Sequence, residues 1–286
     1  MSRRRLPRSE PPSSRSLDVV CVGDCGVDRY VSLGENRPGG MTLNVAVHAR
    51  ACLPPADRVT VVTALGRDAE AELVIGAIER FGLTTCLTRL EGRTPVQYIE
   101  LEPSGEKRFV RYDEGVLATF RLGDRERACI AASDLVVMNV YRQVVPFFDD
   151  LVTVPSRGAR FVDFLDLADF DEPVSAVTRY VPHFDIGQFG LSWREPSLID
   201  ALELLARTHD RLFLVTLGSD GSLALGGPDR IHCQAEPVPQ IVDTTGAGDA
   251  FAAGFLASHC HGADVATAMR AGSALAAWAV QRLGAF

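Results

Sequence analysis

Short apolar runs alternate with helix-like patterns from Asp18 onward, and this alternation constrains the fold more than any other feature of the sequence. The apolar runs lie at 19–22, 59–64, 135–140, 160–164, 212–217 and 241–243, and the helical patterns at 44–52, 69–81, 196–208, 250–260 and 265–283. Buried strands that alternate with helices favour an α/β architecture with a mostly parallel sheet. Ligands of such sheets bind at the carboxyl ends of the strands.

One stretch breaks the alternation. Residues 95–102 (PVQYIELE) alternate in polarity, 103–106 (PSGE) have turn chemistry, and 108–113 (RFVRYD) alternate again. This pattern predicts a β-hairpin. Because the hairpin has few apolar residues, we expect it to project from the main sheet as a lid over a cleft.

Composition restricts the possible classes of protein. The 286 residues are 47% hydrophobic and 23% charged, which is typical of a globular chain, and the net charge of −8 disfavours a nucleic-acid partner. Lys107 is the only lysine among 29 basic residues. Without a GKS or GKT tripeptide, a Walker-type phosphate loop is excluded.

The seven cysteines are scattered, odd in number and lack a CxxC pair, which predicts reduced thiols in a cytoplasmic protein. We interpret His259-Cys260-His261 as a polar helix end rather than a metal site. No run approaches the roughly 18 apolar residues of a membrane span, so no membrane partner is expected. Residues 1–17, rich in Arg, Pro and Ser, are expected to be a disordered tail before a domain at 18–286.

Residues 241–256 (IVDTTGAGDAFAAGFL) carry the most informative motif. We expect a strand at 241–243, a glycine-containing turn, and a helix from Asp249. Backbone N–H groups at a helix start attract an anion, and Gly246 and Gly248 allow it to approach closely. A carboxylate such as Asp249 beside an anion site fits a base that accepts a hydroxyl proton during phosphate transfer. The simpler alternative is a helix cap.

This motif resembles the C-terminal signature of the ribokinase-like (PfkB) carbohydrate kinases. Residues 39–40, 44–47 and 65–68 resemble the N-terminal signature, and the likeness runs from about Asp18 to Phe286. Within the family, the chain looks closest to the fructoselysine 6-kinases. The stretches that carry this closer likeness are 22–30, 111–120, 215–222 and 280–286.

The resemblance implies a ribokinase-like three-layer α/β/α sandwich with a mostly parallel sheet and a β lid around 29–40 and 94–114. It implies a catalytic base and an anion hole, a substrate site and a nucleotide site. By this resemblance, the catalytic base is Asp249 and the anion hole consists of Gly246, Ala247 and Gly248. The substrate site consists of Asp28, Gly39, Gly40 and Asn44, and the nucleotide site of Thr216, Gly218, Gly221 and Ser273. It also implies ATP and Mg²⁺ as cofactors, with a monovalent cation as a possible addition, and a homodimer formed through the lid.

Two departures from the family pattern leave the metal ligands open. An Asn-x-x-Glu motif is expected to begin five residues after Asp185, but Gly190 and Trp193 occupy those positions, and Glu195 is the nearest carboxylate. The family often has a basic residue after the acid matched by Asp163, and 164–167 contain none.

The function predicted is ATP-dependent phosphorylation of a hydroxyl on a small sugar or sugar–amine adduct, with fructoselysine at O6 as the specific hypothesis. One alternative is an ordinary hexose, ribose or nucleoside kinase. Another, from a different class, is a non-catalytic sugar- or nucleotide-binding protein on the same fold. The altered segment 190–195 favours the binding protein, and the intact Asp249 favours an enzyme.

Overall fold

The computed structural model describes residues 16–167 and 170–286. The tail expected at 1–17 therefore lies outside the described residues, except for its last two positions. Within the described ranges, no helix is long and apolar enough to cross a membrane.

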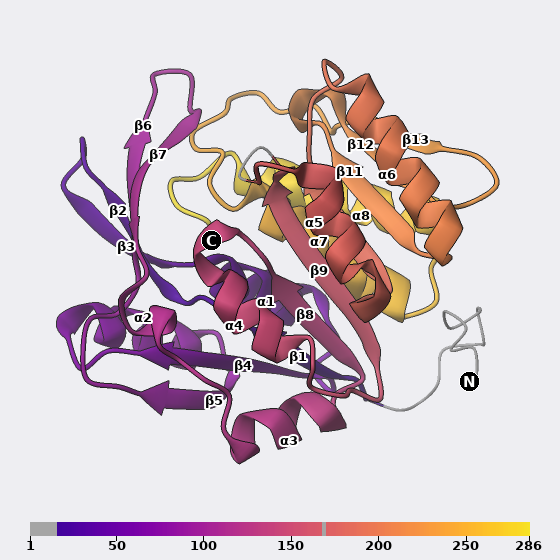
Figure 1. Ribbon diagram of the computed structural model, residues 1–286. Helices are drawn as coiled ribbons and strands as arrows, with labels where there is room; N and C mark the ends of the chain where they lie inside the picture. The colour runs from indigo at the N-terminus through magenta and orange to yellow at the C-terminus, as the bar shows by residue number, and fades with distance from the viewer. Residues whose placement is uncertain (1–15, 168–169) are drawn as a thin grey trace.

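A nine-stranded sheet runs through the centre of the molecule (Figure 1) in the order β13-β12-β11-β10-β9-β8-β1-β4-β5. Within this order, the neighbouring strands β11, β10, β9, β8, β1, β4 and β5 pair in parallel. Strands β12 and β13 add an antiparallel edge beside β11. In chain order they are β1 (Asp18–Val22), β4 (Arg58–Leu65), β5 (Thr84–Arg89), β8 (Leu135–Asn139), β9 (Ala159–Asp166), β10 (Ile186–Gly190), β11 (Leu212–Thr216), β12 (Ser222–Leu225) and β13 (Ile231–Cys233).

Two layers of helices cover this sheet. Side chains of β1 alternate between two buried clusters: Val20 and Val22 join one, and Val19 and Cys21 the other. The helices that pack in the cluster of Val19 are α1 (Met41–Cys52), α2 (Ala69–Arg80), α7 (Ala247–Cys260) and α8 (Val265–Ala279). Those in the cluster of Val20 are α3 (Asp124–Ala132), α4 (Val145–Leu151), α5 (Pro173–Tyr180) and α6 (Pro196–His209). The expected three-layer α/β/α sandwich is confirmed.

A second sheet of four strands, in the order β3-β2-β6-β7, stands beside the large one (Figure 1). Its strands are β2 (Gly26–Tyr30), β3 (Glu35–Gly39), β6 (Val96–Leu101) and β7 (Lys107–Asp113). The hairpin predicted from the sequence is thus present as β6 and β7. Phe109 and Val110 of β7 are half-exposed, at 51% and 48%. That this sheet acts as a lid stays a prediction.

The strand expected at 241–243 is wrong. The backbone N–H groups of Val242 and Asp243 both donate to the Val280 carbonyl, at 2.8 and 3.2 Å, so the segment pairs with the end of α8 instead of joining a sheet. Helix α8 ends at Ala279, short of the predicted 283. Helix α7, which follows segment 241–243 in the chain, begins at Ala247, two residues before the predicted start at Asp249.

Other elements escaped prediction because their patterns are weak. β5 (TTCLTR) is a polar edge strand, and β10 (IGQFG) contains two glycines and a glutamine. Helices α3, α4 and α5 are nine residues or shorter. Short 3₁₀ turns complete the chain at Gly115–Ala118, Arg142–Val144, Val181–His183 and Gly218–Asp220.

All seven cysteines carry free thiols. The rings of His259 and His261, at the end of α7, bond the carbonyls of Ala263 and Ala257. His261 also lies 3.0 Å from the Asp57 carboxylate.

Candidate active site

The N-terminus of α7 forms the centre of the candidate site. Gly246 precedes the helix with φ 76°, and a Cβ built on it would lie 2.5 Å from that of Ala285. Glycine is therefore required there by both conformation and space. Asp249 is consequently the third residue of the helix, which places its carboxyl group in the first turn.

The three amides predicted to form an anion hole are not equivalent. The N–H of Ala247 donates to the Thr244 carbonyl at 3.3 Å. The N–H groups of Gly246 and Gly248 have no protein acceptor in the described part of the chain. A helix N-terminus with unpaired amides is a ready anion-binding position.

Asp249 is buried at 7% exposure, and its carboxylate accepts a hydrogen bond of 2.8 Å from Asn44 Nδ2 on α1. Burial raises the pKa of Asp249 well above its usual range, and the nearby charges of Asp163 and Asp24 raise it further. The Asn44 bond and the charge of Lys107 act in the opposite direction. A buried carboxylate with a raised pKa accepts a proton readily.

Asn44 has a second polar atom. Its Oδ1 is buried and has no hydrogen-bond partner among the described residues. A buried acceptor without a partner is costly unless a ligand supplies the donor. The amide therefore has an oxygen available to a hydroxyl beside Asp249.

Asp28 lies on β2 with its carboxylate over Gly39, where a Cβ would come within 2.2 Å of Oδ2. Burial raises the pKa of Asp28 to about 7, helped by the charges of Asp24 and Asp243 and opposed by Lys107. Asp28 and Asp249 thus share two charged neighbours, Asp24 and Lys107. The structure brings the predicted substrate-binding residues together at the start of α1. They are Asp28, Gly39, Gly40 and Asn44.

Gly40 turns the chain into α1. Its φ is 92°, and a Cβ there would lie 2.8 Å from the Asp24 carbonyl oxygen. Asp24 was missed by sequence reasoning. Its carboxylate accepts from the Met41 N–H at 3.2 Å and from Asn139 Nδ2 at 3.0 Å, so it fixes the start of α1 and hence Asn44. Its position directly after a buried strand was the available signal.

Gln188 and Asp163 were also missed as site residues. Gln188 Nε2 donates to Asp163 Oδ2 at 2.9 Å and to the Gly248 carbonyl at 3.0 Å, which ties β9 and β10 to the start of α7. Burial raises the pKa of Asp163 to about 7. A buried glutamine and aspartate inside apolar strands were the signal.

Asp243 joins three parts of the chain. It is fully buried, and its carboxylate accepts from Tyr30 Oη at 2.5 Å, the Gly284 N–H at 2.9 Å and the Thr245 N–H at 2.8 Å. Tyr30 belongs to the small sheet. The loop of residues 243–246, which precedes α7, is therefore held by both the small sheet and the C-terminal segment.

Three of the predicted nucleotide-binding residues, Thr216, Gly218 and Gly221, lie at the end of β11 or just after it. Thr216 Oγ1 donates to the Phe189 carbonyl at 3.4 Å. Gly218 and Gly221 both have left-handed backbones, with φ 59° and 91°, and Gly221 has no room for a Cβ because the Cys233 carbonyl would be 2.1 Å away. These contacts shape a tight turn at the end of the strand.

Ser273 on α8 has its hydroxyl engaged by protein. It accepts from the Glu236 N–H at 3.1 Å and donates to the Gln234 carbonyl at 3.4 Å. These bonds anchor the loop at 234–236 to α8. The adenine contact that the family resemblance implies for Ser273 stays a prediction.

Among the described residues there is no group of three or more metal-ligating side chains. Nucleotide-bound Mg²⁺ needs only one or two carboxylates, because phosphate and water supply the other oxygens. Asp163 and Asp249 offer such oxygens, and Gln188 Oε1 is buried without a partner in the described chain.

Glu195, the carboxylate nearest to the altered motif, is committed elsewhere. It stands before the first residue of α6, and its Oε2 accepts from the Ser192 N–H at 3.0 Å. Trp193 is 44% exposed, and its ring meets His232 edge-on at 5.9 Å between centroids.

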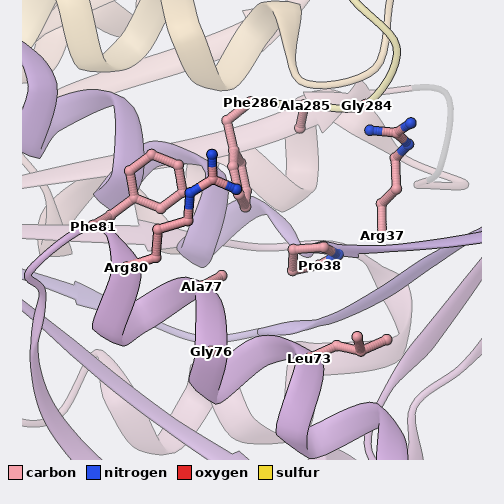
Figure 2. A pocket seen from close by; sticks show the side chains of 10 residues that line it. All are labelled: Arg37, Pro38, Leu73, Gly76, Ala77, Arg80, Phe81, Gly284, Ala285 and Phe286. Atoms are coloured by element: carbon pink, nitrogen blue, oxygen red, sulfur yellow. The ribbon is translucent and has the colours of Figure 1, made fainter.

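A pocket of about 320 Å³ lies beside the C-terminal segment, and Figure 2 shows the side chains that line it. It lies between β3, α2 and residues 284–286, and Arg37, Arg80, Phe81 and Phe286 line it. The predicted substrate and nucleotide residues do not line it. Ala285, one of its lining residues, also lies against Gly246, where a Cβ would come within 2.5 Å of the Ala285 Cβ.

Comparison with known proteins identifies the family of the chain. The family model described as "pfkB family carbohydrate kinase" matches residues 187–286. Fructoselysine 6-kinase of Shigella flexneri is 30% identical over 269 residues, covering 94% of this chain and 99% of that protein. Fructosamine kinase FrlD of Bacillus subtilis (strain 168) is 28% identical, with coverages of 94% and 93%.

Among solved structures, a ribokinase from Giardia lamblia superposes with a TM-score of 0.78 at 21% identity, covering 94% of this chain and 95% of its own. The fold is therefore ribokinase-like. The chain belongs to the PfkB family of carbohydrate kinases and is an ATP-dependent sugar kinase.

Proposed function

We propose that this kinase phosphorylates a fructosamine such as fructoselysine at the 6-hydroxyl of the sugar. The observation that carries the proposal is the buried Asn44–Asp249 pair at the start of α7, with the free Asn44 Oδ1 beside it. The similarity to fructoselysine and fructosamine kinases along 94% of the chain supports the substrate class.

In the proposed mechanism, Asp249 accepts the proton of the substrate hydroxyl as its oxygen attacks the γ-phosphorus of ATP. The amides at the start of α7 stabilise the charge on the transferred group. Their dipole and the Asn44 hydrogen bond keep the carboxylate in place before the transfer.

The remaining proposed roles divide into acceptor and nucleotide sides. Carboxylate and amide groups suit a polyol because each can hold two hydroxyls. The proposed sugar-binding residues are Asp28, Gly39, Gly40 and Asn44. The proposed anion hole consists of Gly246, Ala247 and Gly248. The proposed nucleotide-binding residues are Thr216, Gly218, Gly221 and Ser273.

Mg²⁺ fits the oxygen-rich edge formed by Asp163, Gln188 and Asp249, where it would neutralise phosphate charge. Because Asp163 has a raised pKa, a bound cation would also favour its ionised form. A monovalent cation, a homodimer through the small sheet and a cytoplasmic location stay predictions.

A substrate panel tests this function. With ATP and Mg²⁺, we expect kcat/KM for fructoselysine to exceed that for fructose by about 10-fold or more, which corresponds to one charge-assisted contact with the amine. Ribose and adenosine should be poorer. Equal efficiency for fructoselysine and fructose, or a preference for ribose or a nucleoside, would overturn the fructosamine assignment and leave the sugar kinase intact.

A further inference from the structure

The pocket between β3, α2 and residues 284–286 takes no part in the proposed reaction, because none of the predicted sugar, anion-hole or nucleotide residues lines it. Its volume of about 320 Å³ is large enough for a small organic molecule. We call it the α2 pocket. Its lining is mixed: part of it is apolar, and part of it is positively charged.

Gly76 forms an open part of this pocket. It lies within α2, where glycine is a poor helix former. A Cβ built on Gly76 meets no atom within 4 Å, so no neighbouring group of the protein requires glycine at this position. The missing side chain leaves space over the helix that a ligand can fill.

The apolar part of the lining consists of aliphatic and aromatic side chains. Leu73 and Ala77 come from α2, and Pro38 comes from β3. The rings of Phe81 and Phe286 meet edge-on, with their centroids 5.4 Å apart. Leu73 is 42% exposed, so an apolar ligand that packs on it would remove hydrophobic surface from water.

The charged part of the lining consists of two arginines. Figure 2 shows Arg80 beside the rings of Phe81 and Phe286, and Arg37 at the other end of the pocket. Among the described residues that line the pocket there is no acidic side chain, although the chain as a whole has a net charge of −8. Guanidinium groups bind carboxylates and phosphates through charge-assisted hydrogen bonds. The pocket is therefore suited to an anion.

Both guanidinium groups have donors to spare. Arg37 Nη2 pairs with Glu35 at 2.8 Å in an exposed contact, but Arg37 Nε is buried without a hydrogen-bond partner among the described residues. Arg80 has no carboxylate partner in the described chain, and its guanidinium carbon lies 5.4 Å from the centroid of the Phe81 ring. A buried donor without a partner is costly unless a ligand supplies the acceptor.

Segment 284–286 contacts both the α2 pocket and the loop before α7. Ala285 lines the pocket and lies against Gly246. Its carbonyl bonds His48 Nε2 on α1 at 2.8 Å, and the Gly284 N–H donates to Asp243 at 2.9 Å. A ligand in the pocket would therefore pack on the same segment that packs against Gly246.

We propose that the α2 pocket is a second ligand site of this kinase, and that it takes a small organic anion with an aromatic body. The aromatic body would lie over Gly76 and against the apolar side chains, and the anionic group would bind the guanidinium groups of Arg37 and Arg80. Because the site is separate from the residues of the proposed reaction, it does not depend on which sugar is phosphorylated.

Calorimetric titration with 2-naphthoate tests the charge requirement. AMP-PNP and Mg²⁺ are present, so that the nucleotide site is occupied. We expect saturable binding at one site, and about 10-fold weaker binding of 2-naphthamide, a neutral molecule of nearly the same shape. The double variant Arg37→Gln/Arg80→Gln should remove this preference. Arg108→Gln, which removes an exposed charge outside the pocket, should keep it.

Gly76→Leu tests the position of the site. The new side chain fills the pocket without a clash, so we expect both probes to bind about 10-fold more weakly or worse. Leucine is a better helix former than glycine, so the melting temperature should be equal or higher. Gly227→Leu is the control: Gly227 is exposed and outside the pocket, with the Asp229 carbonyl oxygen 3.6 Å from an added Cβ. It should bind 2-naphthoate like the wild type.

Three results would overturn the site: no saturable binding of 2-naphthoate up to about 1 mM, equal affinity for 2-naphthoate and 2-naphthamide, or unchanged binding in Gly76→Leu. Displacement of 2-naphthoate by AMP-PNP would also overturn it, because the probe would then occupy the nucleotide site. None of these measurements uses sugar turnover. They therefore decide the α2 pocket separately from the fructosamine assignment.

Discussion

The two sheets of this kinase differ in what holds them together. The large sheet is buried on both faces, and strands such as β8 (LVVMN) have every side chain buried. In the small sheet, β7 is exposed or half-buried along its whole length, and Val31, Leu33, Phe109 and Val110 are about half-exposed.

This difference indicates a division of roles. Two apolar clusters stabilise the large sheet, and Val27 of β2 and Val96 of β6 in the small sheet join one of them. The small sheet also has polar contacts with the loop of residues 243–246, namely the Tyr30–Asp243 bond and the bonds between Lys107 and Thr244. The Lys107–Thr244 contacts are only partly buried and each contribute about 1 kcal/mol, so they can break and re-form during a catalytic cycle, whereas the Tyr30–Asp243 bond is buried.

The largest expected effect lies on the side of the large sheet. Asp249→Asn keeps the shape and removes the base, so kcat should fall by about 10²-fold or more. Affinity for ATP should change little or rise, because a negative charge near the phosphates is lost. Asp264→Asn, at the exposed start of α8, is the control and should retain activity. If Asp249→Asn turned over at nearly the wild-type rate, Asp249 would be a helix cap and not the catalytic base.

The Asp163→Asn variant tests how much the burial of a carboxylate in the large sheet lowers the free energy of unfolding. Because its folded pKa is raised to about 7, the folded state binds its proton more tightly than the unfolded state, and stability falls as pH rises from about 4 through 7. Asp163→Asn should lose less stability between pH 5 and 8, by about 2 kcal/mol. Denaturant unfolding at the two pH values measures this, and identical pH dependence in both proteins would contradict it.

Tyr30 tests the deeper attachment of the small sheet. Tyr30→Phe deletes the 2.5 Å bond to Asp243 and should cost about 1–2 kcal/mol of unfolding free energy. Hydrogen exchange should increase in β2 and β3 more than in β8. Tyr180→Phe, which deletes a 2.8 Å bond to Asp149 away from the small sheet, should leave exchange in β2 unchanged. Equal exchange in β2 in all three proteins would refute the attachment.

Thr244→Val tests the shallower attachment and should have the smallest effect. The side chain that accepts the Lys107 N–H and donates to Glu106 is lost, while the Thr244 backbone bonds remain. We expect KM for the sugar to rise about 3-fold, and exchange in 96–113 to increase, with a smaller change when substrate is bound. Strong, equal protection of 96–113 with and without substrate would show an ordinary sheet and no lid.

Local patterns predicted the elements whose signals are local. The two-residue period of the β6–β7 hairpin and its PSGE turn lie in one short stretch. Segment 241–243 misled the prediction because the backbone N–H groups of Val242 and Asp243 bond to the Val280 carbonyl at the end of α8, a partner that no local pattern specifies.

The sequence by itself determined the α/β alternation, the hairpin and the glycine-rich start of α7, because periodicity and glycine conformation act over a few residues. Only the tertiary structure decided the environment of the site. Asn44 and Asp249 meet across 205 positions, and Lys107 reaches Thr244 across 137. The order of strands in the sheet sets such long-range contacts, and with them the burial and charge that surround each carboxylate.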